Sequence, residues 1–103
     1  MTTATMQLAQ TILEQLGGRK FLAMTGANNL MTFDNGLQIK LPSNFATNGI
    51  NVVRITLTPA DEYDVEFGKL RGLNYKVIET VEGVYCDMLQ DVFTSATGLL
   101  TSL

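Results

Sequence analysis

The 103-residue sequence contains no histidine, no tryptophan and a single cysteine, Cys86. Zinc, haem and most transition metals take histidine or cysteine ligands, so the composition argues against such centres. Histidine-based catalytic triads are excluded for the same reason. One cysteine cannot form an intramolecular disulfide, which fits a reducing compartment. A catalytic site would have to rely on carboxylates, lysine, tyrosine or serine, and we predict no enzymatic activity and no cofactor.

A large excess of charge is also missing, since seven basic and ten acidic residues give a net charge of −3. Nucleic-acid-binding surfaces are typically basic, so this balance disfavours a nucleic-acid partner. No apolar stretch is long enough to span a membrane, and the N-terminus lacks the basic region of a signal peptide. With 103 residues, 46% of them hydrophobic, we predict one domain over residues 1–103, and the absence of these segments predicts a cytoplasmic location.

Apolar residues at helical spacing are present at the N-terminus. The spacing of Met6, Ala9, Ile12, Leu13 and Leu16 predicts an amphipathic helix from about Thr3 to Leu16. Gly17 and Gly18 would end this helix, because glycine tolerates left-handed backbone angles.

A second apolar stripe is present near the C-terminus. It consists of Tyr85, Met88, Leu89, Val92, Phe93 and Ala96, and Gly98 would end the helix. Cys86 neighbours this stripe. We expect its thiol to be buried and inert, because no base is present to activate it.

The segment after the first helix begins with the apolar run Phe21–Met24, followed by Thr25–Asn29. The second stretch has the residue types of an anion-binding nest. It contains only one glycine, however, and it precedes an expected strand, whereas phosphate loops open a helix. We therefore interpret Phe21–Met24 as a strand and Thr25–Asn29 as a hairpin connection to the strand that starts at Leu30.

The next hairpin would join Leu30–Phe33 to Leu37–Leu41. A two-residue Asn35-Gly36 turn would set apolar Phe33 opposite polar Gln38. A three-residue Asp34-Asn35-Gly36 turn pairs Phe33 with Leu37 and Met31 with Ile39, which keeps one apolar face. We predict the three-residue turn.

The clearest hairpin joins Asn51–Thr58 to Glu62–Lys69 around Pro59-Ala60-Asp61. One register buries every apolar side chain on one face: Val53, Ile55, Leu57, Tyr63, Val65 and Phe67. The same register pairs Arg54 with Glu66 and Thr56 with Asp64 on the other face. Asn74–Ile78 would add a further strand.

These elements predict a single two-layer α+β domain with an antiparallel sheet of five or six strands. The N-terminal and C-terminal helices would pack on one face, since each has a single apolar stripe. The other face, with Arg54, Thr56, Asp64 and Glu66, would see solvent. Asp64 and Glu66 share a strand face, and we interpret them as a solvated pair partly neutralised by Arg54 rather than a cation site.

The irregular segment from Pro42 to Asn51 is the second candidate binding surface, because loops on a rigid scaffold often carry function. Phe45 would be an apolar anchor there, or else would cover the edge of the core. The candidate partner-binding residues are Asn44, Phe45, Asn48, Arg54, Asp64 and Glu66. No catalytic, metal-binding or cofactor-binding residue is predicted.

The stretches LGGRKFLAMTGANN and YDVEFGKLRGLNYKV, within Leu16–Leu103, resemble small uncharacterised proteins of bacteriophages and other mobile elements. The resemblance implies a prokaryotic, cytoplasmic accessory protein that binds and modulates a host or defence factor, and it assigns no functional residue. We predict a non-enzymatic protein-binding module that forms a homodimer, because the sheet would have an unguarded edge. The alternatives are a single-stranded nucleic-acid-binding accessory protein and a small-ligand-binding domain.

Overall fold

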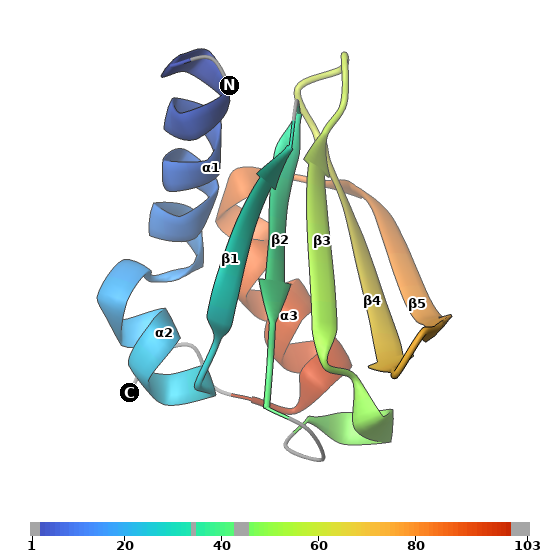
Figure 1. The fold of residues 1–103 in the computed structure, drawn as a ribbon. Helices are drawn as coiled ribbons and strands as arrows, with labels where there is room; N and C mark the ends of the chain where they lie inside the picture. The colour runs from blue at the N-terminus through green and yellow to red at the C-terminus, as the bar shows by residue number, and fades with distance from the viewer. Residues whose placement is uncertain (1–2, 34, 43–45, 100–103) are drawn as a thin grey trace.

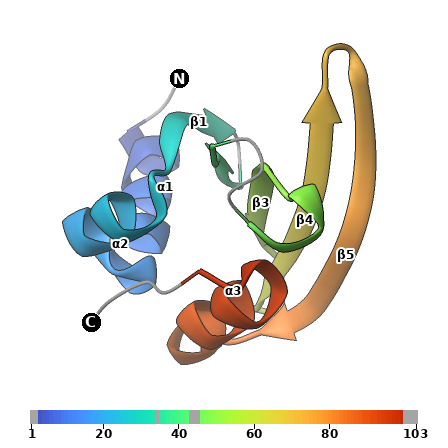
Figure 2. The ribbon, with the colours of Figure 1, turned by 90° about the horizontal axis from the view of Figure 1, so that it is seen from below.

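A computed structural model of the chain describes residues 3–33, 35–42 and 46–99. Its antiparallel sheet follows the chain order from β1 to β5: β1 (Asn28–Phe33), β2 (Gly36–Lys40), β3 (Val52–Leu57), β4 (Tyr63–Arg71) and β5 (Asn74–Val84). The helices are α1 (Thr3–Leu16), α2 (Gly18–Thr25) and α3 (Leu89–Thr97), with short 3₁₀ turns η1 (Thr47–Gly49) and η2 (Cys86–Met88). All three helices lie on the same side of the sheet (Figures 1 and 2). The predicted α+β class and the five-stranded sheet are therefore confirmed.

The core lies between the sheet and the helices. Fully buried side chains come from the sheet (Leu37, Ile39, Val53, Ile55, Val65 and Phe67) and from the helices (Ile12, Leu16, Phe21, Leu89 and Phe93). Burying aliphatic and aromatic side chains of this size stabilises the fold by about 1.5–3 kcal/mol each. Among the described residues, no helix has the length and apolar character needed to cross a membrane.

The β3–β4 hairpin has the predicted register at every pair. Val53 lies opposite Phe67, Ile55 opposite Val65 and Leu57 opposite Tyr63. The Thr58 N–H donates to the Glu62 carbonyl at 2.8 Å, so the turn closes where the pattern predicted. The apolar side chains of this hairpin face the helices, although Leu57 is only half-buried.

The interpretation of Phe21–Met24 as a strand was wrong, because this run belongs to α2. The turn at Gly17, which has φ 128°, separates α2 from α1, and the new helix buries Phe21 and Thr25 on one side. Thr25 Oγ1 donates to the Phe21 carbonyl at 2.7 Å, and Gly26 ends the helix in the left-handed conformation. The Thr25–Asn29 cluster is thus neither a hairpin turn nor an anion nest, because its first two residues form a helix C-terminus.

Helix α3 ends in the same way as α2. Thr97 Oγ1 donates to the Phe93 carbonyl at 2.7 Å, and the left-handed Gly98 donates its N–H to the Thr94 carbonyl at 2.8 Å. Both helices therefore carry the pattern Phe-x-x-x-Thr-Gly, which apolar periodicity alone does not reveal.

The predicted register of the β1–β2 hairpin was also wrong. Phe33 pairs with Gly36, Thr32 with Leu37 and Met31 with Gln38, so two residues rather than three connect the strands. This one-residue shift turns Met31 and Phe33 to the face away from the helices. A Cβ at Gly36 would approach two atoms of the Phe33 ring to 2.7 and 2.9 Å, which shows that the ring lies over the glycine. The pairing thus depends on a glycine that leaves room for an aromatic ring.

Strand β5 continues beyond the predicted Ile78 to Val84, and two irregularities in its pairing with β4 accompany this length. Such bulges bend a strand and increase its twist. The predicted burial of Cys86 was wrong, because Cys86 is exposed in η2. Tyr85 and Met88 are exposed as well. Within the predicted apolar stripe, the first buried residue is Leu89, where α3 begins.

Candidate functional site

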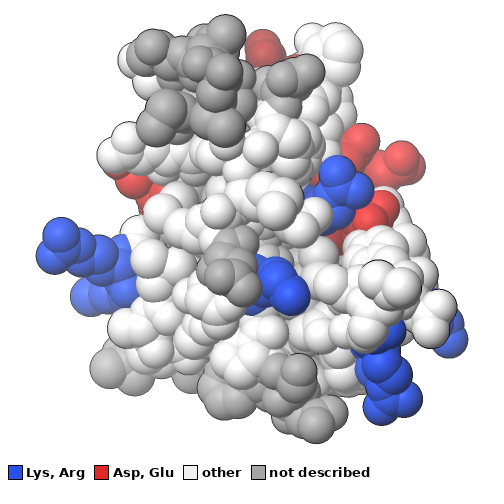
Figure 3. Space-filling model, in the orientation of Figure 1, with Lys and Arg blue, Asp and Glu red and all other residues white. Residues whose placement is uncertain are grey.

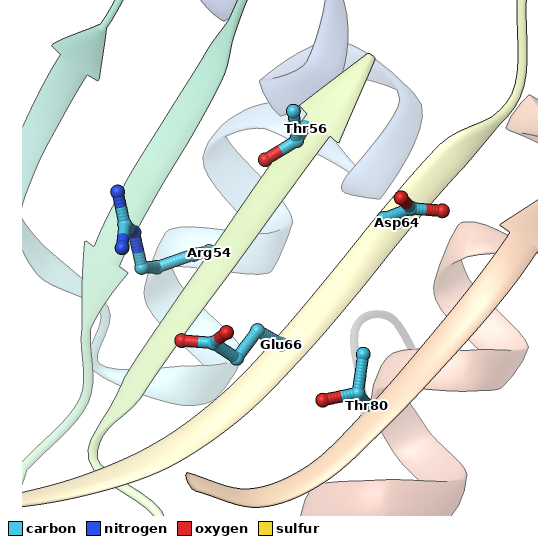
Figure 4. A pocket seen from close by; sticks show the side chains of 5 residues that line it. All are labelled: Arg54, Thr56, Asp64, Glu66 and Thr80. Carbon is cyan, nitrogen blue, oxygen red and sulfur yellow. The ribbon is translucent and has the colours of Figure 1, made fainter. Parts of the chain in front are cut away.

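The sheet face away from the helices is hollowed in two adjoining places. One hollow of about 280 Å³ is lined by Arg54, Thr56, Asp64, Glu66 and Thr80 (Figure 4). The other, of about 210 Å³, is lined by Gln38, Val52, Arg54, Leu70 and Tyr75. Arg54 belongs to both. We call these nine residues the open-face groove; they come from four adjacent strands, β2 to β5.

Arg54 occupies the middle of the open-face groove. Its guanidinium carbon lies 5.1 Å from the centre of the Phe33 ring, and Figure 4 shows the side chain directed towards β2. A guanidinium over an aromatic face gains a cation–π attraction of about 0.5–1 kcal/mol when exposed. Phe33 can remain on the solvent side of the sheet because Gly36 lies below its ring and Arg54 above it.

Glu66 lies opposite Arg54 in the β3–β4 register, as predicted, but it has a different hydrogen-bond partner. The Tyr75 hydroxyl donates to Glu66 Oε2 at 2.7 Å. Burial, the hydrogen bond to Glu66 and the negative charge of Glu66 together raise the pKa of Tyr75 to about 12, against an opposing effect of Arg54. Tyr75 is therefore a neutral donor that holds the Glu66 carboxylate in place.

The Tyr75 ring is itself positioned by a glycine. A Cβ at Gly68 would overlap the Tyr75 hydroxyl and ring, so the ring lies directly over Gly68. Phe33 over Gly36 and Tyr75 over Gly68 are thus two equivalent arrangements on the same sheet face. Because each ring lies over a glycine, both aromatic side chains leave the polar surface of the open-face groove exposed next to Arg54.

Asp64 and Glu66 lie on one strand face, as their spacing predicted, but their carboxylates diverge. Asp64 Oδ1 accepts a hydrogen bond of 3.4 Å from the Gly83 N–H of β5, whereas Glu66 reaches towards β3 (Figure 4). General acid–base pairs need two groups that converge on one reacting centre. This arrangement instead offers two separate acceptors, with the Thr56 and Thr80 hydroxyls beside them.

The predicted partner-binding residues separate into two sets. Arg54, Asp64 and Glu66 lie together in the open-face groove. Asn48 is exposed in η1, where its left-handed backbone (φ 59°) forms part of the turn before β3. Asn44 and Phe45 lie outside the described residues.

Asn51, at the end of this segment, has a structural role that the sequence pattern did not reveal. The Asn51 side chain accepts from the Leu70 N–H at 2.8 Å and donates to the Leu70 carbonyl at 2.9 Å. The Asn51 N–H also donates to the Gly68 carbonyl, so Asn51 extends the pairing of β3 with β4. Its predicted position at the start of a strand was the one available signal.

Gln38, Thr80 and Tyr75 were also missed as groove residues. Gln38 alternates with buried Leu37 and Ile39 and lies opposite Arg54, whereas the place of Thr80 on the open face depends on the irregular β4–β5 pairing, which simple alternation does not predict.

The comparisons with known proteins do not identify a relative. The sequence matches no protein-family model, and neither the curated proteins nor the solved structures gave a significant match.

Proposed function

We propose that this protein is a non-enzymatic protein-binding module and that the open-face groove is its contact surface. The observation that carries the proposal is the composition of the groove. Arg54, Asp64 and Glu66 line one hollow of the groove, and the adjoining hollow, which shares Arg54, has a floor that includes buried Val52 and half-buried Leu70. An apolar floor with polar groups at its margin is the usual anatomy of a protein-binding surface.

The groove favours a polar segment of a partner protein that carries a lysine or arginine. Two diverging carboxylates can accept hydrogen bonds from a cationic side chain, while the Thr56 and Thr80 hydroxyls can donate or accept. The guanidinium of Arg54 already lies over Phe33, which leaves the carboxylates as the available charged groups. Exposed ion pairs contribute under about 1 kcal/mol each, so tight binding would also require contact with the floor.

The biological setting is a second part of the proposal. The resemblance to bacteriophage and mobile-element proteins supports an accessory protein that binds and modulates a host or defence factor in the cytoplasm. A compact domain with a mixed-charge groove fits that role, because blocking a host protein requires surface complementarity and no chemistry.

Affinity capture from a bacterial lysate tests the groove. The bait proteins are the wild type, Asp64→Asn/Glu66→Gln, and the matched control Glu14→Gln/Asp91→Asn, whose substitutions are exposed on α1 and α3. We expect a protein that the wild type and the control retain and that the groove variant loses. Equal retention by all three baits contradicts the proposal.

The same variants discriminate the nucleic-acid alternative. Removing two negative charges from the groove should strengthen binding to a single-stranded oligonucleotide and weaken binding to a cationic protein segment. Salt-sensitive oligonucleotide binding by the wild type, with tighter binding by Asp64→Asn/Glu66→Gln, would contradict protein binding and support single-stranded nucleic-acid binding instead.

A further inference from the structure

The turn end of the β4–β5 hairpin carries basic side chains without acidic neighbours. Residues 68–77 contain Lys69, Arg71 and Lys76 and no aspartate or glutamate. Lys69 lies directly opposite Lys76, and Arg71 follows Lys69 on the same face of β4, the face that carries buried Phe67 further along the strand. Like charges directly opposite each other on neighbouring strands are destabilising. The fold therefore keeps three cations together that the turn end itself does not neutralise.

The acidic residues of the hairpin lie towards its other end, as Figure 3 shows for the face it presents. At about 3.4 Å per residue, Glu66 lies about 17 Å along β4 from Arg71, and Glu79 lies about 10 Å along β5 from Lys76. The Debye length is about 8 Å at about 0.15 M salt, so charges at these separations are largely screened. The turn end therefore acts as a cationic surface despite the net negative charge of the chain.

The apex of the hairpin is apolar. Gly72 and Leu73 form the two-residue turn between Arg71 and Asn74, and Gly72 has a positive φ of 61°. Leu73 is fully exposed, although such turns favour Gly, Asn, Asp or Ser. Figure 2 shows that the turn projects away from the helices. An extended surface can therefore contact Leu73 and the cations behind it without meeting the rest of the molecule.

We propose that this turn end binds an anionic phospholipid surface, and we call its four residues, Lys69, Arg71, Leu73 and Lys76, the cationic apex. With Leu73 at the boundary of the acyl chains, Arg71 lies beside the turn, and the lysine pair lies about 7 Å further back along the strands. The headgroup layer of a bilayer is about 5–8 Å thick, so all three cations would lie at the depth of the lipid phosphates. This contact is peripheral and needs no membrane-spanning segment.

Two features of the cationic apex favour a lipid surface over a nucleic acid. Leu73 gains from the apolar acyl boundary, whereas a phosphate backbone offers an apolar side chain no partner. Three cations also contact at most three phosphates, against about 6–10 in proteins whose DNA binding is strongly electrostatic. A flat surface meets only the apex, whereas a nucleic acid lying along the hairpin would reach the carboxylates of Glu66 and Asp64.

Cosedimentation with lipid vesicles tests the proposal. We expect the wild type to bind equimolar phosphatidylcholine–phosphatidylglycerol vesicles more tightly than pure phosphatidylcholine vesicles, and to be released in about 1 M salt, where the Debye length is about 3 Å. Each lysine or arginine near an anionic surface strengthens binding by about fivefold, so Arg71→Gln/Lys76→Gln should weaken it by about 25-fold. Both residues are exposed, and losing Lys76 removes a like-charge pair, so this variant should remain folded. Leu73→Ser should weaken vesicle binding by about fivefold.

Matched controls separate the cationic apex from general effects of charge and apolar exposure. Arg19→Gln/Lys20→Gln removes the same charge from exposed positions on α2, which lies across the molecule from the hairpin turn (Figure 2). Met31→Ser removes an exposed apolar side chain from β1. Both controls should bind anionic vesicles like the wild type.

Three outcomes overturn the proposal. The first is a wild type that does not bind anionic vesicles, and the second is equal weakening in the controls. The third is a single-stranded oligonucleotide that binds more tightly than the vesicles and whose binding Leu73→Ser leaves unchanged, because a nucleic acid would then be the ligand of this surface. None of Arg71, Leu73 and Lys76 lines the open-face groove, so failure here is distinct from failure of the capture experiment.

Discussion

The rings of Phe21 and Phe93 lie edge to face, with their centroids 5.0 Å apart and their planes at 70°. Each phenylalanine also accepts, through its backbone carbonyl, the hydrogen bond of a buried threonine four residues later. The contact therefore joins α2 to α3 at the same position of the same Phe-x-x-x-Thr-Gly pattern. Two short helices far apart in the sequence are held together at fully buried residues.

The first prediction concerns the coupling between these rings. Phe21→Leu and Phe93→Leu should each lower the free energy of unfolding, and a double-mutant cycle should give a coupling of about 0.5–1.5 kcal/mol. Urea denaturation measures all four proteins. Phe33→Leu combined with Phe93→Leu is the control, because Phe33 lies on the other face of the sheet and the two effects should add. A coupling of zero for Phe21 and Phe93 would mean that the rings contribute only through their burial.

The second prediction concerns Asn51. Asn51→Ala removes both side-chain hydrogen bonds to Leu70 and leaves two partly buried backbone groups without them. We expect the free energy of unfolding to fall by about 2 kcal/mol. Asn74→Ala, at an exposed position of β5, should change it by less than about 0.5 kcal/mol. Equal effects of the two substitutions would show that the Asn51 contacts contribute nothing specific.

The third prediction concerns the two glycines beneath aromatic rings. Gly68→Ala should cost about 1–3 kcal/mol because its Cβ overlaps the Tyr75 ring, and the cost should fall in a Tyr75→Ala background. Gly36→Ala should remain costly in a Phe33→Ala background, since its Cβ also meets the Ile55 backbone carbonyl. Thermal unfolding of the single and double variants separates the two cases. Rescue of both glycines, or of neither, contradicts this account.

The fourth prediction concerns pH. The pKa of Tyr75 is about 12 in the folded protein, against an ordinary value of 10.0, mainly because of burial and then because of Glu66. A raised pKa means that the neutral phenol stabilises the folded state. This stabilisation is complete below pH 10 and is lost as the pH rises from 10 to about 12.

An ultraviolet titration of phenolate formation measures that pKa directly. Tyr75→Phe should remove the step near pH 12, and Glu66→Gln should move it towards 10 without reaching it, because burial remains. Asp64→Asn is the matched control on the same strand and should move the step less, since the hydrogen bond from Tyr75 goes to Glu66. A step that does not respond to Glu66→Gln would assign the shift to burial alone.

The parts of the fold that the sequence predicts are those in which one local rule is sufficient. Alternation fixes the β3–β4 register, because a one-residue shift would put Tyr63, Val65 and Phe67 of β4 on the face opposite to Val53 and Ile55 of β3. Helical spacing and a terminal glycine fix α1 and most of α3. From the register alone, Arg54, Asp64 and Glu66 were expected on one face, and the structure places them there.

Only the tertiary structure decides the features in which two rules compete. An apolar run as short as Phe21–Met24 fits a strand or a helix, and the buried contact of Phe21 with Phe93 favours the helix. The β1–β2 register does not place all apolar side chains on one face. Phe33 can lie on the solvent side because Gly36 and Arg54 enclose its ring there. Likewise Tyr75 reaches Glu66 only because β4 has a glycine at position 68. Sequence periodicity reports the average environment of a strand face, whereas these arrangements depend on single side chains that meet across strands, and such contacts exist only once the chain has folded.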